Sequence, residues 1–521
     1  MDKYNLNVIY NRNIQNIIGV NNDLLVGIKD DFRWFKEHTI NNIVVMGYNT
    51  FLTLPGKKSI NPLRNRLNII ISKNHYDTLI ELVKNSEDPL DVIVYKSFDE
   101  FYIQWFPCKA NHYQTLFMKN NENTQSILTK YKDIRDFFII GGSKLYNYIF
   151  DNYHIDTIYE TISNIKIDTS EYIRDGNKIT YFRREIKDHF LKTYSGDLLT
   201  DKIELNGGLK YGRINKENIG YNFNIYQHRE NVNLQEFQYL KLLKDIYKEG
   251  VKRDSRNSSV LSVFSPHPMR FDLREGLPLL TSKKVQWKTV LKELLWFISG
   301  STDNKVLNKN KVTIWNGNSS KEYMERIGLS HYKEGDLGPI YGFQWRHFGA
   351  KYIDCDNDYK GEGIDQLSYI INEIKNNPTS RRIILSSWNP MDINKMALPP
   401  CHVMVQFYVD TKNKYLDAKL IQRSGDMFLG IPFNIASYSI LMHIIGNLTG
   451  YIPRYFIHDI GDAHIYDKHR SAIDIQLKRK TFNFPQLIIK RNFKDIDDIN
   501  EEDFEIKDYK YYPFIKAEMI A

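Results

Sequence analysis

Short apolar runs alternate with amphipathic stretches along the first 230 residues. Residues 41–47 (NNIVVMG) and 66–72 (RLNIIIS) are apolar runs bounded by Asn, Gly or Ser, a pattern that predicts buried strands. Residues 30–39 (DDFRWFKEHT) predict a helix whose first turn is acidic, where the helix dipole favours negative charge. Residues 137–150 (FFIIGGSKLYNYIF) predict a strand, a Gly-Gly turn and a helix. This alternation predicts an α/β sheet.

Two stretches break the alternation. Residues 74–136 are less periodic and contain polar clusters such as MKNNENTQS (118–126), so we expect an insertion there, with a mobile loop. Residues 220–240 end a strand near Gln227 and begin a helix after a short polar link. We therefore expect two domains, residues 1–230 and 231–521, the second being one large α+β domain.

Composition adds a basic balance and few cysteines. The net charge of +8 is consistent with a solvated basic surface or with attraction of anionic ligands such as nucleotides and glutamyl folates. We see no zinc-finger or aromatic RNA-binding signature, so nucleic-acid binding is not expected. The three cysteines, Cys108, Cys355 and Cys401, are too widely spaced for a disulfide framework or a CxxC metal pair.

These features predict a cytoplasmic or other reducing compartment. The first residues, MDKYNLNVIYNRN, lack the pattern of a signal peptide. No apolar run approaches the roughly 18 residues that a transmembrane helix needs. We therefore expect no membrane segment.

One cysteine stands out by its surroundings, ALPPCHVMVQF (397–407). A cysteine attacks as the thiolate, so a reactive Cys401 needs a nearby positive charge or base. His402 is adjacent in sequence, but neighbours on a strand point to opposite faces. Partners for a nucleophile must therefore come from elsewhere in the fold. Read alone, Cys401 is more often a small core residue.

The other polar candidates are also ambiguous singly. Arg423 is consistent with a surface charge, Asn434 with a helix N-cap, and His464 with a hydrogen-bonded core histidine. In DAHIY (462–466), strand alternation places Asp462, His464 and Tyr466 on one face. Three polar groups on one face indicate ligand binding or exposure to water.

Together, these motifs resemble thymidylate synthase in their order and spacing, from about residue 235 to the end. The motifs are DLGPIYGFQWRH (336–347), SRRIILSSWNP (380–390), LPPCH (398–402), QRSGDMFLGIPFNIASY (422–438) and GDAHIY (461–466), with MRFDLREGLPLLTSKKV (269–285), ELLWFISG (293–300) and the tail YYPFIKAEMIA (511–521). The resemblance implies reductive methylation of dUMP to dTMP with 5,10-methylenetetrahydrofolate as cosubstrate. It also implies a homodimer joined through this half, and no metal.

The resemblance assigns roles to the catalytic candidates. Cys401 would attack C6 of the uracil, and Tyr341 would help to remove the C5 proton. Glu293 lies in an apolar helical stripe, where a carboxylate is costly unless it is used, so we expect it to transfer protons.

By the same resemblance, arginines bind the phosphate through planar guanidinium groups, two of them donated by the partner subunit. We expect this cluster also to favour the Cys401 thiolate. An asparagine amide would read the uracil edge, which offers an acceptor at O4 and a donor at N3. The dUMP residues are Arg256, Arg423, Ser424, the partner-donated Arg381 and Arg382, Asn434 for the base, His464 and Tyr466 for the ribose, and His402, Gln422 and Asp426; the folate residues are Trp315, Asn318 and Asp426. Three positions depart from the family pattern: RNS at 256–258, Ser265 and Gly425.

The first half resembles dihydrofolate reductase more loosely. The matching segments are IGVNNDLL (18–25), DDFRWFKEHT (30–39), VVMGYNTF (44–51), PLRNRLNIIIS (62–72), FFIIGGSKLY (137–146) and DTIYETI (156–162). The resemblance implies NADPH-dependent reduction of the dihydrofolate that the second half releases. The fold class expected is therefore an α/β dihydrofolate-reductase-like domain followed by an α+β thymidylate-synthase-like domain. The alternative is a thymidylate synthase fused to a degenerate, structural or folate-binding module.

In this half the resemblance makes Asp31 the active-site acid, supported by Thr161. The remaining folate residues are Phe32, Phe35 and Arg66, and those facing NADPH are Gly19, Gly47, Thr50, Ser72, Gly141, Gly142 and Tyr146. A Gly-Gly pair at a strand-to-helix turn permits close approach of a phosphate.

Several departures fall in the same region. The family's Leu-Pro-Trp is LLV at 24–26, two alanines that line the pterin are Tyr10 and Asn11, and the basic residue that faces the 2′-phosphate is Tyr48, followed by Asn49. Tyr10 would crowd the pterin if it lined the pocket. Loss of a phosphate-paired charge costs about 1.5–3 kcal/mol, or roughly 10–150-fold in affinity.

Overall fold

A computed structural model describes residues 4–519 except 22, 26, 55–62, 87–90, 107–129, 132, 168, 175–177, 183–185, 187–189, 197–198, 202–218 and 255–257. The chain divides into two compact units, Met1–Asn231 and Val232–Ala521.

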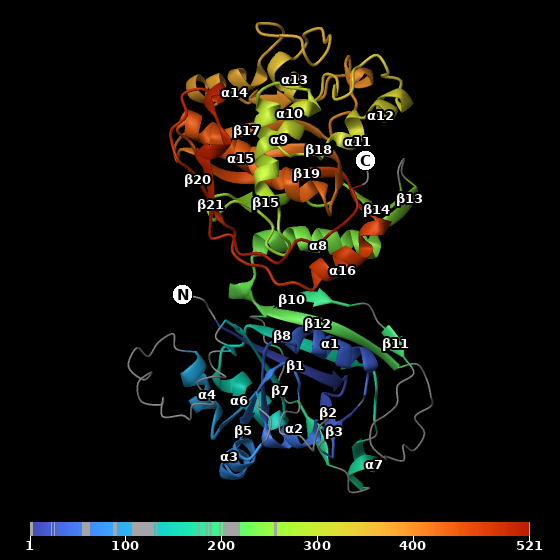
Figure 1. Cartoon of the computed structure of the whole chain (residues 1–521), viewed down its shortest axis with the longest axis vertical. Helices are drawn as coiled ribbons and strands as arrows, with labels where there is room; N and C mark the ends of the chain where they lie inside the picture. Colours follow the sequence, from blue (N-terminus) through green and yellow to red (C-terminus); the bar gives the residue numbers. More distant parts are fainter. Residues whose placement is uncertain are drawn as a thin grey trace. The chain divides into compact units, whose positions relative to one another are not determined.

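A mainly parallel sheet forms the centre of the first unit (Figure 1, blue to green). Strand β1 pairs in parallel with β7 and β8, and the parallel pairing continues through β4, β5 and β6. Among the described residues the order is β10 (Phe190–Ser195), β12 (Ile219–His228), β8 (Thr157–Ser163), β1 (Asn5–Asn13), β7 (Asp136–Gly141), β4 (Ile43–Gly47), β5 (Leu67–Ile71) and β6 (Val92–Tyr95), with β11 (Leu199–Asp201) on β12. The antiparallel strands lie beyond β8.

Strand alternation gives this sheet two apolar faces, because successive side chains point to opposite sides. On β1, Ile9 belongs to one core cluster, whereas Val8 and Tyr10 belong to the other. The first cluster includes Trp34 and Leu79 from helices α1 (Lys29–Thr39) and α3 (Tyr76–Lys84). The second includes residues of α4 (Phe98–Trp105) and α6 (Ser143–Asn152). Helices therefore cover both faces, as the α/β prediction requires.

The predicted strands at 41–47 and 66–72 and the predicted helix at 30–39 are confirmed. The prediction of an insertion over 74–136 is wrong where the structure forms α3 (Tyr76–Lys84), β6 (Val92–Tyr95) and α4 (Phe98–Trp105). Strand β6 has only four residues, and all are buried beside β5, so its alternation is too short to detect. Residues 107–129 of the expected mobile loop lie outside the described residues.

The second unit is built on a mixed sheet against helices (Figure 1, green to red). Its order among the described residues is β13 (Val251–Asp254), β14 (Ser259–Phe264), β19 (Ile452–Tyr466), β18 (Tyr415–Asp426), β17 (His402–Asp410) and β16 (Ile384–Ser386), with β15 (Met269–Asp272) on β19. Helix α15 (Gly430–Thr449) packs on β18 and β19 and against α9 (Trp287–Ile298). Mixed pairing with separate helices agrees with the predicted α+β class. No helix within the described ranges is both long and apolar enough to cross a membrane.

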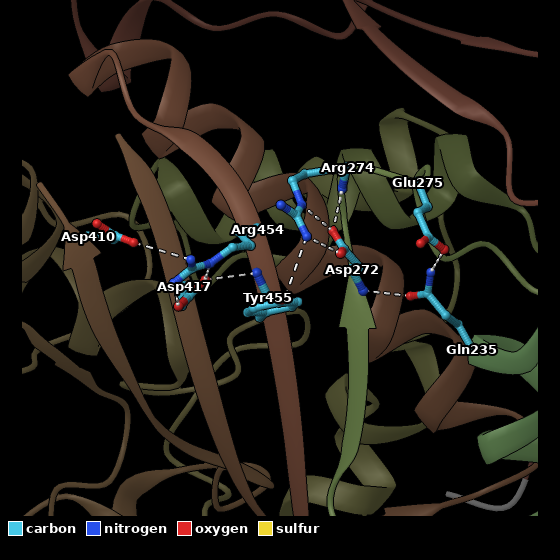
Figure 2. A network of polar contacts seen from close by, with 8 residues as sticks. All are labelled: Gln235, Asp272, Arg274, Glu275, Asp410, Asp417, Arg454 and Tyr455. Carbon is cyan, nitrogen blue, oxygen red and sulfur yellow. Dashed lines mark hydrogen bonds and ion pairs between the residues drawn. The ribbon is translucent and has the colours of Figure 1, made fainter. Parts of the chain in front are cut away.

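Figure 2 shows a series of polar contacts that joins one end of this sheet to helix α8 (Leu234–Glu249). Arg454 on β19 donates to both oxygens of Asp417 on β18, at 2.9 and 2.7 Å. On β15, Asp272 accepts from Arg274, and its backbone N–H donates to Gln235 of α8 at 2.5 Å. Bidentate pairs of this kind are directional as well as strong. They hold the strand ends and α8 in register, and therefore the strands that carry the site.

Candidate active sites

In the first unit, an acid on α1 meets two residues on adjacent strands. Asn11 on β1 and Thr161 on β8 are partners in the parallel register, so both side chains lie on the same face. Asp31, in the first turn of α1, accepts hydrogen bonds from the Thr161 hydroxyl and from Asn11 Nδ2, the latter at 3.0 Å. Burial raises the pKa of Asp31, and these two hydrogen bonds offset only part of the increase. The prediction did not foresee Asn11 as a partner of the acid.

The residues assigned to folate lie around this acid on α1 and near its end. Phe35 packs against the core cluster that contains Trp34, whereas Phe32 is exposed. Arg66 is buried, donates from Nε to Thr39 Oγ1 at 2.9 Å, and lies 5.7 Å from the Phe35 ring. The structure thus places a guanidinium beside one predicted aromatic contact.

Glycines bring two backbone segments together at the carboxyl ends of β4 and β7. A Cβ on Gly141, whose φ is +143°, would lie 2.8 Å from Thr50 Oγ1, and a Cβ on Gly47 would lie 3.9 Å from Gly141 O and Gly142 N. Glycine at positions 141 and 142 therefore makes room for the Thr50 side chain, at the position assigned from the sequence to the dinucleotide phosphates. We use "cradle" for Gly47, Thr50, Gly141 and Gly142.

The other residues assigned to the dinucleotide lie at different places. Ser72 is buried and accepts from His75 N at 3.2 Å, and the Tyr146 hydroxyl donates to Ile9 O at 2.8 Å. Gly19 lies on β2 (Ile17–Val20), in a separate small sheet. Tyr48, in place of a basic residue, stacks on His75 with ring centroids 3.8 Å apart.

The concern that Tyr10 crowds the pterin applies only if Tyr10 lines the pocket. Its ring stacks on Phe182, and its hydroxyl donates to Glu160 at 3.1 Å, on the sheet face opposite Asn11. The side chain therefore does not lie beside Asp31. Val26, at the position of the family's tryptophan, lies outside the described residues.

In the second unit, Arg423 holds the loop that carries the cysteine. Its Nε donates to Pro400 O and its Nη2 to Pro399 O, both at 2.9 Å, and its backbone N–H donates to Cys401 O at 2.9 Å. Strand pairing of His402 with Gln422 fixes this arrangement. The phenolic oxygen of Tyr341 accepts from Cys401 N at 2.7 Å. Sequence-distant residues thus converge on Cys401.

Arg423 acts on the Cys401 thiol in the expected direction, but burial outweighs it. Burial raises the pKa of Cys401; Arg423 and the Tyr341 hydroxyl oppose that rise without outweighing it. The contribution of the other three arginines stays a prediction. Arg381 and Arg382 are exposed before β16, and Arg256 lies outside the described residues.

Next to Tyr341 lie the Trp315 indole and the buried Glu293 carboxyl. Trp315 Nε1 donates to Glu293 Oε1 at 2.8 Å, and the Trp315 and Tyr341 rings lie 6.2 Å apart. Burial raises the pKa of Glu293 to about 7, with the indole hydrogen bond opposing the rise. Asn318 is buried near Trp315, whose carbonyl accepts from its backbone N–H at 3.0 Å. A carboxyl with this pKa changes protonation near neutral pH, as a general acid–base requires.

The predicted base-reading residue lies inside α15, so its interpretation as an N-cap is wrong. Asn434 accepts from Gln422 Nε2 at 3.1 Å, and Gln422 also contacts His458 at 2.8 Å. One helical turn beyond Asn434 is Tyr438, whose ring lies 5.2 Å from that of His402. Sequence reasoning missed His458 and Tyr438; the i, i+4 spacing from Asn434 was the available signal for Tyr438.

The remaining dUMP and folate candidates follow the β18–β19 register. Ser424 pairs with Asp462 and Asp426 with His464. On β19, Asp462, His464 and Tyr466 alternate with buried Ala463 and Ile465, which confirms the predicted shared face. The Asp426 carboxylate accepts from Phe428 N at 2.9 Å.

Two departures from the family pattern have local explanations. Ser265, at a glycine position of the family, has φ of +51°, a region that glycine occupies more easily. A Cβ on Gly425 would lie 2.4 Å from Ile431 Cδ1, so this glycine makes room for Ile431.

A possible metal cluster elsewhere is poorly suited to binding. Among the described residues, Asp303, Cys355 and Asp356 place their ligand atoms within 4.8 Å of one another. Burial and Asp336 raise the pKa of Cys355 to about 12, and Lys333 pairs with Asp356. A protonated thiol and a lysine-paired carboxylate are weak ligands, so we assign no metal here.

Comparisons with known proteins cover both units. Residues 237–521 match the family model of thymidylate synthase, and residues 5–104 match that of dihydrofolate reductase. The chain is 37% identical over 506 residues to the bifunctional dihydrofolate reductase-thymidylate synthase of Paramecium tetraurelia, with 96% of each chain covered. It is 36% identical over 539 residues to that of Zea mays, covering 98% of this chain and 97% of the relative. Human thymidylate synthase is 52% identical over 285 residues, covering 54% of this chain and 90% of the relative.

The two folds and sites define an enzyme with two folate-dependent activities, a methyltransferase and an oxidoreductase, in one chain. The chain belongs to the family of bifunctional dihydrofolate reductase–thymidylate synthases. The full-length relatives are named for both activities, and no comparison supports the alternative of a degenerate reductase-like module.

Replacing Trp315 should move the titration of Glu293. The Trp315→Phe substitution removes a donor that stabilises the carboxylate, so the pKa of Glu293 should rise above its present value of about 7. A hydrogen bond to a charged group is worth about 1.5–3 kcal/mol, which corresponds to a rise of about one pH unit or more. The measurement is the inflection in kcat/KM for dTMP formation against pH. Trp296→Phe is the control, since Trp296 donates to Asp303 O. An unchanged or lowered inflection would contradict the assignment.

Replacing Asn11 should free an oxygen of Asp31. In Asn11→Ala, the oxygen now bonded to Asn11 Nδ2 becomes available, and the pKa of Asp31 should rise further because a stabilising donor is lost. A 2,4-diaminopyrimidine that binds both carboxylate oxygens should therefore bind about fivefold more tightly, as expected for one hydrogen bond of about 1 kcal/mol. Calorimetric titration of the full chain measures this. Asn5→Ala is the control, because it removes an Asn–Asp hydrogen bond elsewhere on β1. Weaker or equal binding in Asn11→Ala would refute the competition.

Proposed function

We propose that Cys401 is the nucleophile that adds to C6 of dUMP in the synthase half. The convergence of Arg423, Cys401 and Tyr341 on one loop carries this assignment. Arg423 and Ser424 would bind the phosphate, and the Tyr341 oxygen, which already accepts from Cys401 N, keeps its own hydrogen for donation toward the substrate.

The proton transfers fall to Glu293 and Tyr341. The Glu293 pKa of about 7 leaves both of its forms populated near neutral pH, so it can give and take a proton in one cycle. Tyr341 would assist removal of the C5 proton. The folate, held by Trp315, Asn318 and Asp426, supplies the one-carbon unit and the hydride.

Recognition of the nucleoside would come from the β18–β19 face and α15. The Asn434 amide can accept from N3–H and donate to O4, whereas cytosine presents the reverse pattern. His464 and Tyr466 would bind the ribose hydroxyl. His402 lies between the Tyr341 and Tyr438 rings, and burial lowers its pKa to about 4, so it stays neutral.

In the reductase half, Asp31 would hold the pterin, with Phe32, Phe35, Arg66 and Thr161 around the folate. The cradle of Gly47, Thr50, Gly141 and Gly142 fits NADPH, which supplies the hydride when bound. Gly19, Ser72 and Tyr146 would complete that site. Tyr48 replaces a basic residue, so recognition of the 2′-phosphate would fall to other groups.

We also propose that the synthase half is a homodimer. The outward face of β17, β18 and β19 exposes Tyr408, which is 64% accessible, and carries partly exposed Ile421 and Ile457 farther along. A second copy on this face would cover apolar surface. Such a partner would also explain why Arg381 and Arg382 are exposed: the arginines that act on one Cys401 would come from the other subunit, and their charge would lower the pKa of the thiol.

Two substitutions should separate the two activities. Cys401→Ser should abolish dTMP formation from dUMP and methylenetetrahydrofolate while leaving NADPH oxidation by dihydrofolate intact. Asp31→Asn should do the reverse, because it removes only the reductase acid. A loss of general acid–base catalysis is worth about 10²–10⁴-fold. Continued dTMP formation in Cys401→Ser, or undiminished NADPH oxidation in Asp31→Asn, would overturn the respective assignment.

Mixing inactive subunits should test the shared site. Subunits carrying Cys401→Ser and subunits carrying Arg381→Glu, unfolded and refolded together, should recover about a quarter of normal synthase activity, since half of the dimers would contain one intact site of two. Cys401→Ser mixed with Arg423→Ala should recover none, because Arg423 serves the cysteine of its own chain. Equal outcomes in the two mixtures would exclude donation of Arg381 across the interface.

A further inference from the structure

A buried histidine that no step above uses, His458, lies in the middle of β19. His458 is completely buried, and its Nε2 lies 2.8 Å from Gln422 Oε1. Its Nδ1 has no hydrogen-bond partner among the described residues. An amide oxygen only accepts, so Nε2 must carry the hydrogen. Burial, with His402 nearby, lowers the pKa of His458 to about 3, which keeps the ring neutral.

Gln422 accepts this hydrogen bond and in turn orients the Asn434 amide. It is 2% exposed, and its amino group donates to Ser424 O at 2.9 Å and to Asn434 Oδ1 at 3.1 Å. A backbone carbonyl can only accept, so the amino end of Gln422 must face Ser424. The Ser424 carbonyl therefore fixes which way the Gln422 amide faces. His458, with its hydrogen on Nε2, donates to the oxygen end of the same amide and adds a second hydrogen bond that stabilises this orientation.

The consequence falls on Asn434, because an asparagine amide can be rotated to exchange its oxygen and its nitrogen. With Gln422 donating, Asn434 must present its oxygen to that side. This orientation suits uracil, which offers N3–H and O4, and the reversed one suits cytosine. A carboxamide free to rotate would serve both bases.

We propose that His458 is a positioning residue that, through Gln422, holds the Asn434 amide in the orientation that reads uracil and so sets selectivity for uracil over cytosine nucleotides. The proposal rests on the proposed role of Asn434 as the base-reading residue. His458 need not touch the substrate, since its effect passes through two buried amides.

The test compares the dissociation constants of dUMP and dCMP for the full-length enzyme, by calorimetry, and the tritium release from both nucleotides labelled at C5. In His458→Phe, which removes the donor, the dCMP-to-dUMP ratio of dissociation constants should fall about tenfold, the effect of losing one well-formed buried hydrogen bond. His458→Gln, which can restore a donor near the Nε2 position, should keep the ratio within about twofold of the original.

His443→Phe is the matched control. His443 is a half-buried imidazole of the second unit, on α15, and its buried Nε2 has no hydrogen-bond partner in the described chain. Its replacement should leave the ratio unchanged, so a general effect of removing a buried histidine is excluded. If His458→Phe does not fold, as judged by circular dichroism, Gln422→Glu tests the same relay, because a carboxylate cannot donate to Asn434.

The Asn434→Ala substitution distinguishes the positioning role of His458 from the base-reading role of Asn434, on which it rests. A ratio that falls in Asn434→Ala but stays unchanged in His458→Phe and Gln422→Glu would overturn the positioning role alone. A ratio unchanged in Asn434→Ala as well would overturn the base-reading role of Asn434, and the relay with it. A loss of dUMP affinity with an unchanged ratio in His458→Phe would show a structural role only, which also contradicts the proposal.

Discussion

The chemistry of both halves depends on ionisable groups that are buried away from water and only partly stabilised by neighbouring hydrogen bonds and charges. Asp31, Glu293 and Cys401 each lie where burial raises the pKa, and in each case the opposing hydrogen bonds or charges recover only part of the increase. In such a group the protonated form is more populated at a given pH than it would be in a solvated group. A ligand or partner that brings charge can then shift its pKa further. Perturbed groups of this kind are common at catalytic sites.

Such groups need a rigid support, and strand register provides it in each unit. Asn11 and Thr161 converge on Asp31 because they are partners across β1 and β8. His402 and Gln422 are likewise partners across β17 and β18, which places Cys401 against Arg423. The polar contacts of Figure 2 hold the far ends of the same strands. A shift of one residue would move every one of these side chains to the other face.

The sequence predicts individual strands and helices best. It misses contacts between distant residues that depend on how the strands pair. The apolar runs at Ile43–Gly47 and Leu67–Ile71 and the acidic first turn of α1 carry their own signal, so those elements were predictable. The four-residue β6 is too short for its alternation to be informative. The net rise of the Cys401 pKa was not foreseen, because the sequence does not reveal how far the thiol is buried. His458 was missed because only the folded chain brings it beside Gln422.

Successive side chains of a strand point to opposite faces, so the adjacent residues Tyr10 and Asn11, which both differ from the reductase pattern, have unrelated effects. Asn11 faces the acid, where its amide occupies one carboxylate oxygen. Tyr10 faces the opposite core, where Glu160 is 1% exposed and already bonded to Arg12 Nε at 2.7 Å. A buried carboxylate needs several donors, and the Tyr10 hydroxyl is one of them. The residue at position 10 is thus part of a buried polar network, and only the residue at position 11 contacts Asp31. Divergence in this half therefore has to be read face by face along each strand, because a count of altered motif residues would give Tyr10 and Asn11 equal weight.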